Sequence, residues 1–182
     1  MDRTRRFAAG WLVAAVLGVS ALNGCTLFGG GDDIADDKPP QIEVGGNGRV
    51  KDSIATYTAE SGSYKVTMDV IALKRYDDVV RLVFAVTPQS KGGSDPLPSD
   101  AFSSETLGND VTGVYLLDTD NMRKYPVLSG GKECVCSNEL DDFPLDQPTA
   151  LYADYPAPPD SVESMTVVFK NVGPLPGVEV SA

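Results

Sequence analysis

The 182-residue sequence contains no histidine, and this absence limits its chemistry more than any other feature of the composition. Without histidine there is no Ser-His-Asp or Cys-His catalytic set, no His-ligated zinc site and no copper site of the cupredoxin kind. An enzyme of this composition would need carboxylates, lysine, tyrosine or a thiol as its acid and base, which is uncommon. The sequence therefore predicts a protein that is not an enzyme and that uses no cofactor.

Positive charge is also scarce, because 15 Lys and Arg residues stand against 26 Asp and Glu residues, for a net charge of −11. The first 24 residues hold three of the arginines and one of the acids, so the remainder has a net charge near −13. An acidic surface repels nucleic acids and anionic lipid headgroups. We therefore expect no nucleic-acid partner, and any attachment to a membrane must come from an apolar group.

Long apolar runs are confined to the start of the chain, where a basic segment with three arginines precedes an apolar run over residues 7–22. The run is shorter than the ~20 apolar residues that a membrane-spanning helix needs, and small residues precede the cysteine that follows it. This pattern predicts a secretory signal peptide over residues 1–24.

The signal ends at Leu22-Asn23-Gly24-Cys25, which resembles the lipobox of bacterial lipoproteins. The resemblance implies cleavage after Gly24, transfer of diacylglyceryl to the Cys25 thiol and acylation of the new amino terminus. Membrane lipid, bound through the acylated Cys25, would then be the first partner, and the protein would be lipid-anchored on the extracytoplasmic face of the cell membrane. The alternative is an ordinary signal peptide in which Cys25 has no function.

Residues 25–62 are rich in Gly, Asp and Pro and contain few large apolar side chains. Such a segment buries too little apolar surface to offset the entropy lost when it orders. We therefore expect a flexible tether over 25–62. Only the apolar residues around Val44 and those at 54–58 suggest short strands within it.

From residue 63 to residue 182 the pattern is β throughout. Alternation over 64–73 places Tyr64, Val66, Met68, Val70 and Ala72 on one buried face, and a turn at 75–78 leads to a second, largely apolar strand at 79–87. Further strands are expected at 111–117, 123–128, 149–155, 164–171 and 177–180. About seven strands at such spacing predict an immunoglobulin-like antiparallel β-sandwich, with the strand that contains Pro126 at a sheet edge.

Several short motifs of this region resemble the immunoglobulin-like domains of secreted bacterial lipoproteins that carry the DUF4352 or telokin-like label. They are Val70-Ile71-Ala72-Leu73-Lys74-Arg75, Val79-Val80-Arg81-Leu82, Tyr115-Leu116-Leu117-Asp118, Lys124-Tyr125-Pro126-Val127-Leu128, Cys134-Val135-Cys136-Ser137 and Tyr155-Pro156-Ala157-Pro158-Pro159. More narrowly, the region resembles the N-terminal domain that actinobacterial lipoproteins place before an OmpA-type peptidoglycan-binding domain.

The resemblance implies a non-enzymatic interaction module at the cell envelope, whose partner is an unidentified envelope protein or a cell-wall component. No OmpA-type domain follows in this sequence, so peptidoglycan anchoring is not carried over. The family has no agreed catalytic residue, and the only tryptophan, Trp11, lies in the signal peptide, so the Cys-Trp-Cys core of antibody domains is absent.

Cys134 and Cys136 are the two cysteines left once Cys25 is acylated, and an even count in an oxidising compartment predicts a disulfide between them. In a straight strand their Cα atoms would lie ~6.6 Å apart, near the upper limit for a bridge, so the pairing requires a bend. The alternative is thiol–disulfide exchange or binding of a soft metal such as Cu(I) at this loop, with Met122 or Met165 as further ligands.

Two other groups of residues invite a functional interpretation. Asp118, Asp120, Asp141 and Asp142 lack the glycine and the distant glutamate of an EF-hand loop, so we expect surface turns and no metal site. Tyr125, Tyr152 and Tyr155 are candidates for a sugar-binding face, but aromatic residues in half-buried strands more often pack against their neighbours.

Overall fold

A computed structural model of the protein describes residues 41–46, 48–131 and 133–182, all within one compact unit. The predicted signal peptide 1–24, the lipidation site Cys25 and residues 25–40 of the expected tether lie outside the described residues. The described elements are β1 (Ala55–Ser61), β2 (Tyr64–Tyr76), β3 (Val79–Ser90), the 3₁₀-helix η1 (Ser99–Phe102), β4 (Tyr115–Asp118), β5 (Arg123–Tyr125), β6 (Ser129–Gly130), β7 (Glu133–Cys134), β8 (Thr149–Pro156), β9 (Ser164–Phe169) and β10 (Gly173–Glu179).

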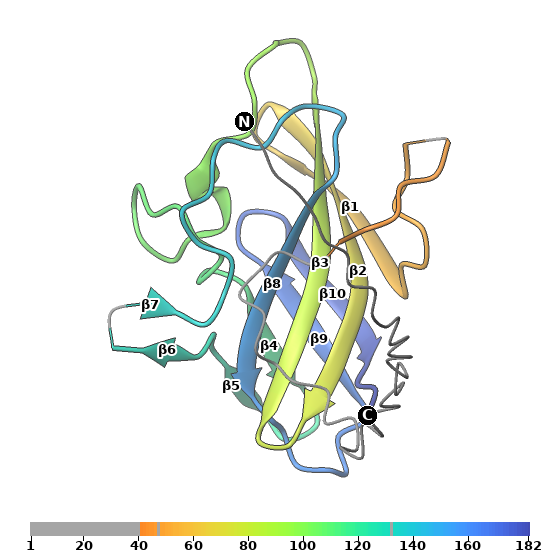
Figure 1. The fold of residues 1–182 in the computed structure, drawn as a ribbon, viewed down its shortest axis with the longest axis vertical. Helices are drawn as coiled ribbons and strands as arrows, with labels where there is room; N and C mark the ends of the chain where they lie inside the picture. Colours follow the sequence, from red (N-terminus) through yellow and green to blue (C-terminus); the bar gives the residue numbers. More distant parts are fainter. Residues whose placement is uncertain (1–40, 47, 132) are drawn as a thin grey trace, which may run out of the picture. The chain divides into compact units, whose positions relative to one another are not determined.

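Eight of the strands form two four-stranded antiparallel sheets that face each other (Figure 1). Sheet 1 has the order β1-β2-β3-β8, and sheet 2 has the order β10-β9-β4-β5, while β6 and β7 form a separate two-stranded ribbon. The predicted all-β class and the antiparallel sandwich are therefore confirmed. In the described part of the chain, no helix reaches the length and apolarity that crossing a bilayer requires.

The core lies between the two sheets and is built from alternate residues of each strand. The rings of Phe84 in β3 and Phe169 in β9 lie 5.4 Å apart, which joins the inner faces of the sheets. Inner-face residues with no exposed surface include Val66, Met68, Val70, Leu73, Val80, Leu82, Leu116 and Val167. Burial of this apolar surface is the main force that holds the sheets together.

The expected alternation along β2 is wrong at its last position. A β-bulge between Val70 and Ala72 inserts one extra residue into the pairing with β3. The extra residue reverses the alternation, so Leu73 enters the core in place of the expected Ala72. The rest of the hairpin follows the prediction, since Asp77 and Asp78 make the turn between β2 and β3.

Strand β1 corrects the boundary expected at residue 62. It spans Ala55–Ser61 and pairs with β2 along its whole length, so the ordered sheet begins within the range assigned to the tether. Its residues are mostly small and polar, and Tyr57 is its one large apolar side chain. The strand is formed by hydrogen bonding to β2 rather than by its own hydrophobic pattern, so the sequence indicated only a short strand at 54–58 and not its full length.

The strands of sheet 2 also differ from their expected limits. Residues 111–114 were expected in a strand but form a turn, in which the Val114 amide donates to the Val111 carbonyl, so β4 begins at Tyr115. Strand β5 ends at Tyr125, directly before Pro126, and it lies at the sheet edge as predicted. Strand β10 contains Pro174 and Pro176, which an edge strand tolerates because its outer side needs no ladder hydrogen bonds.

Candidate functional site

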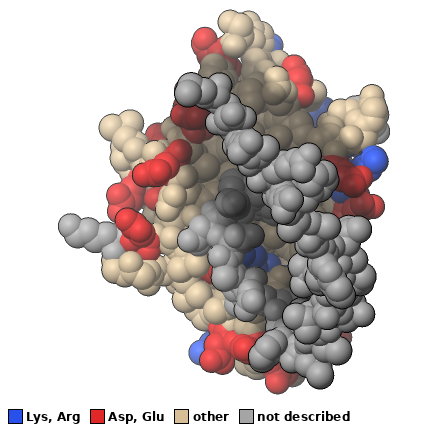
Figure 2. All heavy atoms as spheres, viewed as in Figure 1, with Lys and Arg blue, Asp and Glu red and all other residues tan. Residues whose placement is uncertain are grey.

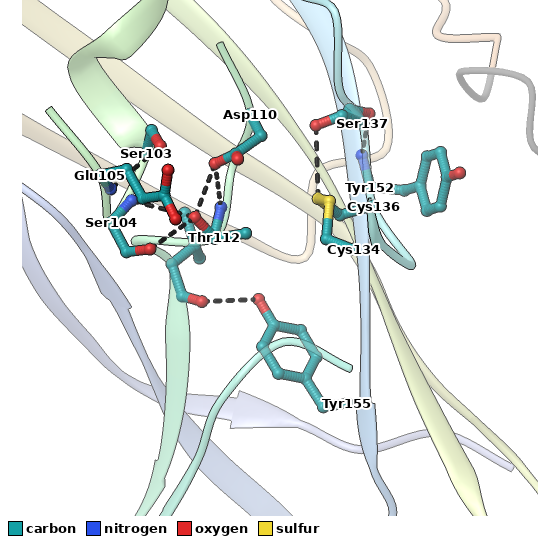
Figure 3. Close-up of a disulfide and its surroundings, with 11 residues drawn as sticks. Ser103, Ser104, Glu105, Asp110, Thr112, Cys134, Cys136, Ser137, Tyr152 and Tyr155 are labelled. Carbon is teal, nitrogen blue, oxygen red and sulfur yellow. Dashed lines mark hydrogen bonds between the residues drawn. A yellow bond between two sulfur atoms is a disulfide. The ribbon is translucent and has the colours of Figure 1, made fainter. Parts of the chain in front are cut away.

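The segment around the predicted disulfide links the two sheets. Cys134 and Cys136 form a disulfide, and their Cα atoms are 5.2 Å apart, so the required bend is present. The residue inside the bridge and the residue after it are both bonded to β8: the Asp154 amide donates to the Val135 carbonyl, and the Ser137 amide donates to the Tyr152 carbonyl. Figure 3 shows the bridge beside Ser137 and β8. The disulfide therefore stiffens a connection between β5 of sheet 2 and β8 of sheet 1.

The other residues proposed from the sequence do not gather around this bridge. Met165 is buried in the core and Met122 is 92% exposed at the turn between β4 and β5. Among the described residues, no group of three or more Cys, Asp or Glu side chains is arranged to hold a metal ion. The soft-metal and redox alternative thus stays a prediction that rests on the two sulfur atoms alone.

The tyrosines proposed for a sugar-binding face are packing residues. Tyr125, Tyr152 and Tyr155 are all buried, and the Tyr155 hydroxyl donates to the Val114 carbonyl at 3.3 Å (Figure 3). Burial raises the pKa of Tyr155 far above its usual value, so its hydroxyl remains protonated. The Tyr125 hydroxyl is buried too, and no described residue is within hydrogen-bonding distance of it.

Asp118 has a structural role at the end of β4. Its carboxylate accepts hydrogen bonds from the Asn121 amide at 3.0 Å and from the Asn121 side chain at 2.7 Å, which closes the turn into β5. These bonds lower the pKa of Asp118. Asp118 therefore begins a turn as expected, but the expectation that it lies at the surface is wrong, because its bonds to Asn121 hold it buried at 3% exposure.

A depression on the outer face of sheet 2 is the site that the sequence did not reveal. We call it the Lys124–Lys170 pocket; its volume is about 560 Å³. It is lined by Ser104, Thr112, Gly113, Tyr115, Lys124, Pro126, Val168, Phe169, Lys170, Asn171, Val172 and Gly173. The pocket extends across β5, β4 and the end of β9, because β4 pairs with both neighbours.

Two lysines supply the charge of the pocket, and each is held by a neutral group. The Lys124 ammonium lies 3.8 Å from the centre of the Tyr115 ring, in a cation–π contact. The Lys170 ammonium donates a hydrogen bond to the Ser103 carbonyl. Within the described residues, neither ammonium has a carboxylate within 4.0 Å, whereas Lys51, Arg75, Arg81 and Lys91 each have one.

A hydrogen-bonded chain of side chains fixes the loop at one wall of the pocket. The Thr112 hydroxyl donates to Asp110 at 2.6 Å and lies 2.8 Å from the Ser104 hydroxyl (Figure 3). The Thr112 hydroxyl also accepts a bond from the Ser104 amide at 3.0 Å. Because these groups satisfy one another, the wall is rigid, and its carboxylate points to the loop rather than lining the pocket.

Gly113 allows this loop to approach Lys170. A Cβ atom at Gly113 would lie 2.4 Å from the Phe102 carbonyl oxygen and 2.9 Å from Cδ of Lys170. The Gly113 amide donates to that same carbonyl at 2.7 Å. Glycine is therefore required where the loop passes over the stem of Lys170.

No family model, no curated protein and no solved structure matches the chain. The signal that could have drawn attention to the pocket was weak, because Lys124 and Lys170 are far apart in sequence. They line the same pocket only because β4 pairs with β5 on one side and with β9 on the other.

Proposed function

We propose that this protein is a membrane-anchored, extracytoplasmic lipoprotein whose β-sandwich is a non-enzymatic interaction module at the cell envelope. The observation that carries the proposal is the Lys124–Lys170 pocket, a depression on the outer face of a sandwich sheet with two cations and no lining carboxylate. The resemblance of Leu22-Asn23-Gly24-Cys25 to a lipobox supports the anchor. The resemblance to lipoprotein domains of the DUF4352 type supports the role of the sandwich as the binding part.

In this proposal the two ends of the sequence have separate roles. Cys25 joins the chain to membrane lipid, and two acyl chains or more give stable attachment where one gives only marginal binding. The acidic surface keeps the sandwich away from anionic headgroups. The pocket then meets its partner, an envelope protein or a cell-wall component, on the side of the sandwich that sheet 2 forms.

The anchor is tested by the variant Cys25→Ser in the full chain, expressed in a bacterium that processes lipoproteins. We expect the unmodified chain in the membrane fraction and in the detergent phase of a phase-separation assay, and the variant in neither. The matched control is Cys136→Ser, which also replaces one cysteine with serine and breaks the Cys134–Cys136 disulfide but leaves the lipobox-like stretch intact, and it should remain membrane-bound. Unchanged membrane association of the Cys25 variant would refute the anchor.

A further inference from the structure

We propose that the Lys124–Lys170 pocket binds an organic anion, in which a carboxylate or phosphate group is held by the two ammonium groups and an apolar body packs on Tyr115 and Val168. The inference rests on the proposed function, because it names the chemistry of the ligand that the interaction module recognises. It concerns a small molecule or an end-group of that size, since the depression of about 560 Å³ lies within the roughly 300–1,000 Å³ typical of small-ligand sites.

The charge of the pocket is opposite to that of the protein. Acidic residues outnumber basic ones by 26 to 15 over the chain, yet none of the twelve pocket residues is acidic and two are lysines. Red acidic side chains are also the commoner charged groups on the face of the described region seen in Figure 2. A cationic depression in such a surface concentrates the field on itself and attracts anions from solution.

The ammonium groups of Lys124 and Lys170 have N–H donors that remain available to a ligand. Each ammonium has three N–H donors; the described partner of Lys170 is one carbonyl oxygen, and that of Lys124 is the face of a tyrosine ring. Both partners are uncharged, so they hold the side chains in place and leave their positive charge without compensation. An oxyanion would supply the missing charge and accept these hydrogen bonds, which are stronger when both groups are ionised.

The rest of the lining predicts that the anion carries an apolar body. Pro126, Val168 and Val172 and the ring of Tyr115 line the pocket beside the lysines. The hydroxyls of Ser104 and Thr112 bond to each other, and the Asn171 side chain donates to the Ala101 carbonyl at 3.0 Å. Because these polar groups already have partners, they have few hydrogen bonds left for a sugar or another polyhydroxy ligand. The lysines and the apolar wall suit an amphipathic anion better.

The test measures binding of three probes to the full chain in a non-ionic detergent, by ligand-observed NMR and titration calorimetry. The probes are 3-phenylpropanoate, phenyl phosphate and the neutral 3-phenylpropanamide. We expect at least one of the two anions to bind at least tenfold more tightly than the amide, and its affinity to fall as salt is raised. Lys124→Gln and Lys170→Gln together should weaken that affinity at least tenfold. Lys91→Gln, which removes one positive charge outside the pocket, should leave it within twofold.

Binding of only one of the two anions would identify the charged group as carboxylate or as phosphate. Equal binding of anion and amide, no binding of either anion, or anion binding unaffected by the lysine changes would each overturn the proposal. Lys124→Gln alone serves where the double variant fails to fold, because Lys124 is an exposed residue of an edge strand. Lysine-dependent binding to vesicles that contain phosphatidylglycerol, without binding of the small probes, would also overturn it in favour of a membrane surface. None of these readouts depends on Cys25, so failure of the anchor and failure of the pocket are distinguishable.

Discussion

The outer faces of the two sheets differ in how their polar groups are satisfied. On sheet 1 they bond to one another across the strands: Arg81 pairs with Asp154 at 2.7 and 2.9 Å, and Thr56 donates to Asp69 at 2.6 Å. On sheet 2 the lysines of the pocket bond only to neutral groups among the described residues. A face whose charges are already paired stabilises the fold, whereas a face with uncompensated charge has interactions left for a ligand.

The largest effect should come from breaking the charge pair on sheet 1. Asp154 is 1% exposed, and Asp154→Asn would leave the partly buried Arg81 without its carboxylate, at a cost of about 3 kcal/mol. The loss is measured as the difference in the free energy of unfolding in urea between Asp154→Asn and the unmodified protein. Glu60→Gln, which breaks the exposed Lys91–Glu60 pair, is the control and should lower the free energy of unfolding far less, because solvent screens an exposed pair. Similar losses in the two variants would show that burial of the pair is unimportant.

The next effect concerns the loop at the wall of the pocket. Gly113→Ala forces a Cβ atom against the Phe102 carbonyl and the Lys170 stem, and overpacking of this kind costs about 1–3 kcal/mol. It should also weaken binding of the anionic probe, because Lys170 must move. Gly130→Ala places its Cβ in open space and should change neither stability nor affinity. A stable Gly113→Ala protein with full affinity would mean that the loop does not fix the lysine.

The contrast between satisfied and unsatisfied groups extends into the core, where two buried tyrosines can be compared. Tyr155→Phe removes the bond to the Val114 carbonyl and should cost about 1 kcal/mol. Tyr125→Phe removes a buried hydroxyl that has no described partner, so it should leave stability unchanged or raise it by up to about 1 kcal/mol. Chemical denaturation of the two variants measures the difference, and equal losses would contradict it.

The smallest effect is a pH dependence at the turn after β4. The bonds from Asn121 hold the pKa of Asp118 below its usual value of 3.8. A carboxyl with a lowered folded pKa adds stability above its unfolded pKa and loses it as the pH falls through the folded pKa. Asp118→Asn should therefore lower the melting temperature at neutral pH. The difference from the unmodified protein should disappear once the pH lies below the lowered pKa of Asp118 in the folded protein. Asn121→Ala should have a similar effect, whereas a pH-independent difference would exclude this origin.

Periodicity predicted the parts of the fold that depend on local sequence. The β2–β3 hairpin, the edge position of β5 and the bend at Cys134 and Cys136 were all expected from alternation, Pro126 and residue spacing. A short strand was suggested at 54–58, but the full extent of β1 to Ser61 was not, because its small polar residues form a strand through pairing with β2. The bulge in β2 was missed because one extra residue leaves no mark on composition.

The pocket could not be predicted for a related reason. Its two lysines belong to different parts of sheet 2, and β4 brings them onto one face by pairing with β5 and β9. Periodicity gives the face of each strand, but it does not give the order of strands in a sheet. The wall formed by Ser104 and Thr112 depends on a loop with no regular pattern. Contacts of this kind follow from topology and are found only once the sheets are assembled.

The position of β9 has a consequence for the order in which the protein folds. Strands β1, β2 and β3 are consecutive and can pair as soon as they leave the ribosome or the translocation channel, but β4 and β5 wait for β9 to complete sheet 2. The amide and carbonyl of Ser181 then bond to Leu73 and Arg75 of β2, across most of the described chain. Such non-local closure makes folding slow and late. Until β9 and β10 have emerged, the apolar inner face of sheet 1 has no complete second sheet to cover it, so the nascent chain is exposed to aggregation and proteolysis at that stage.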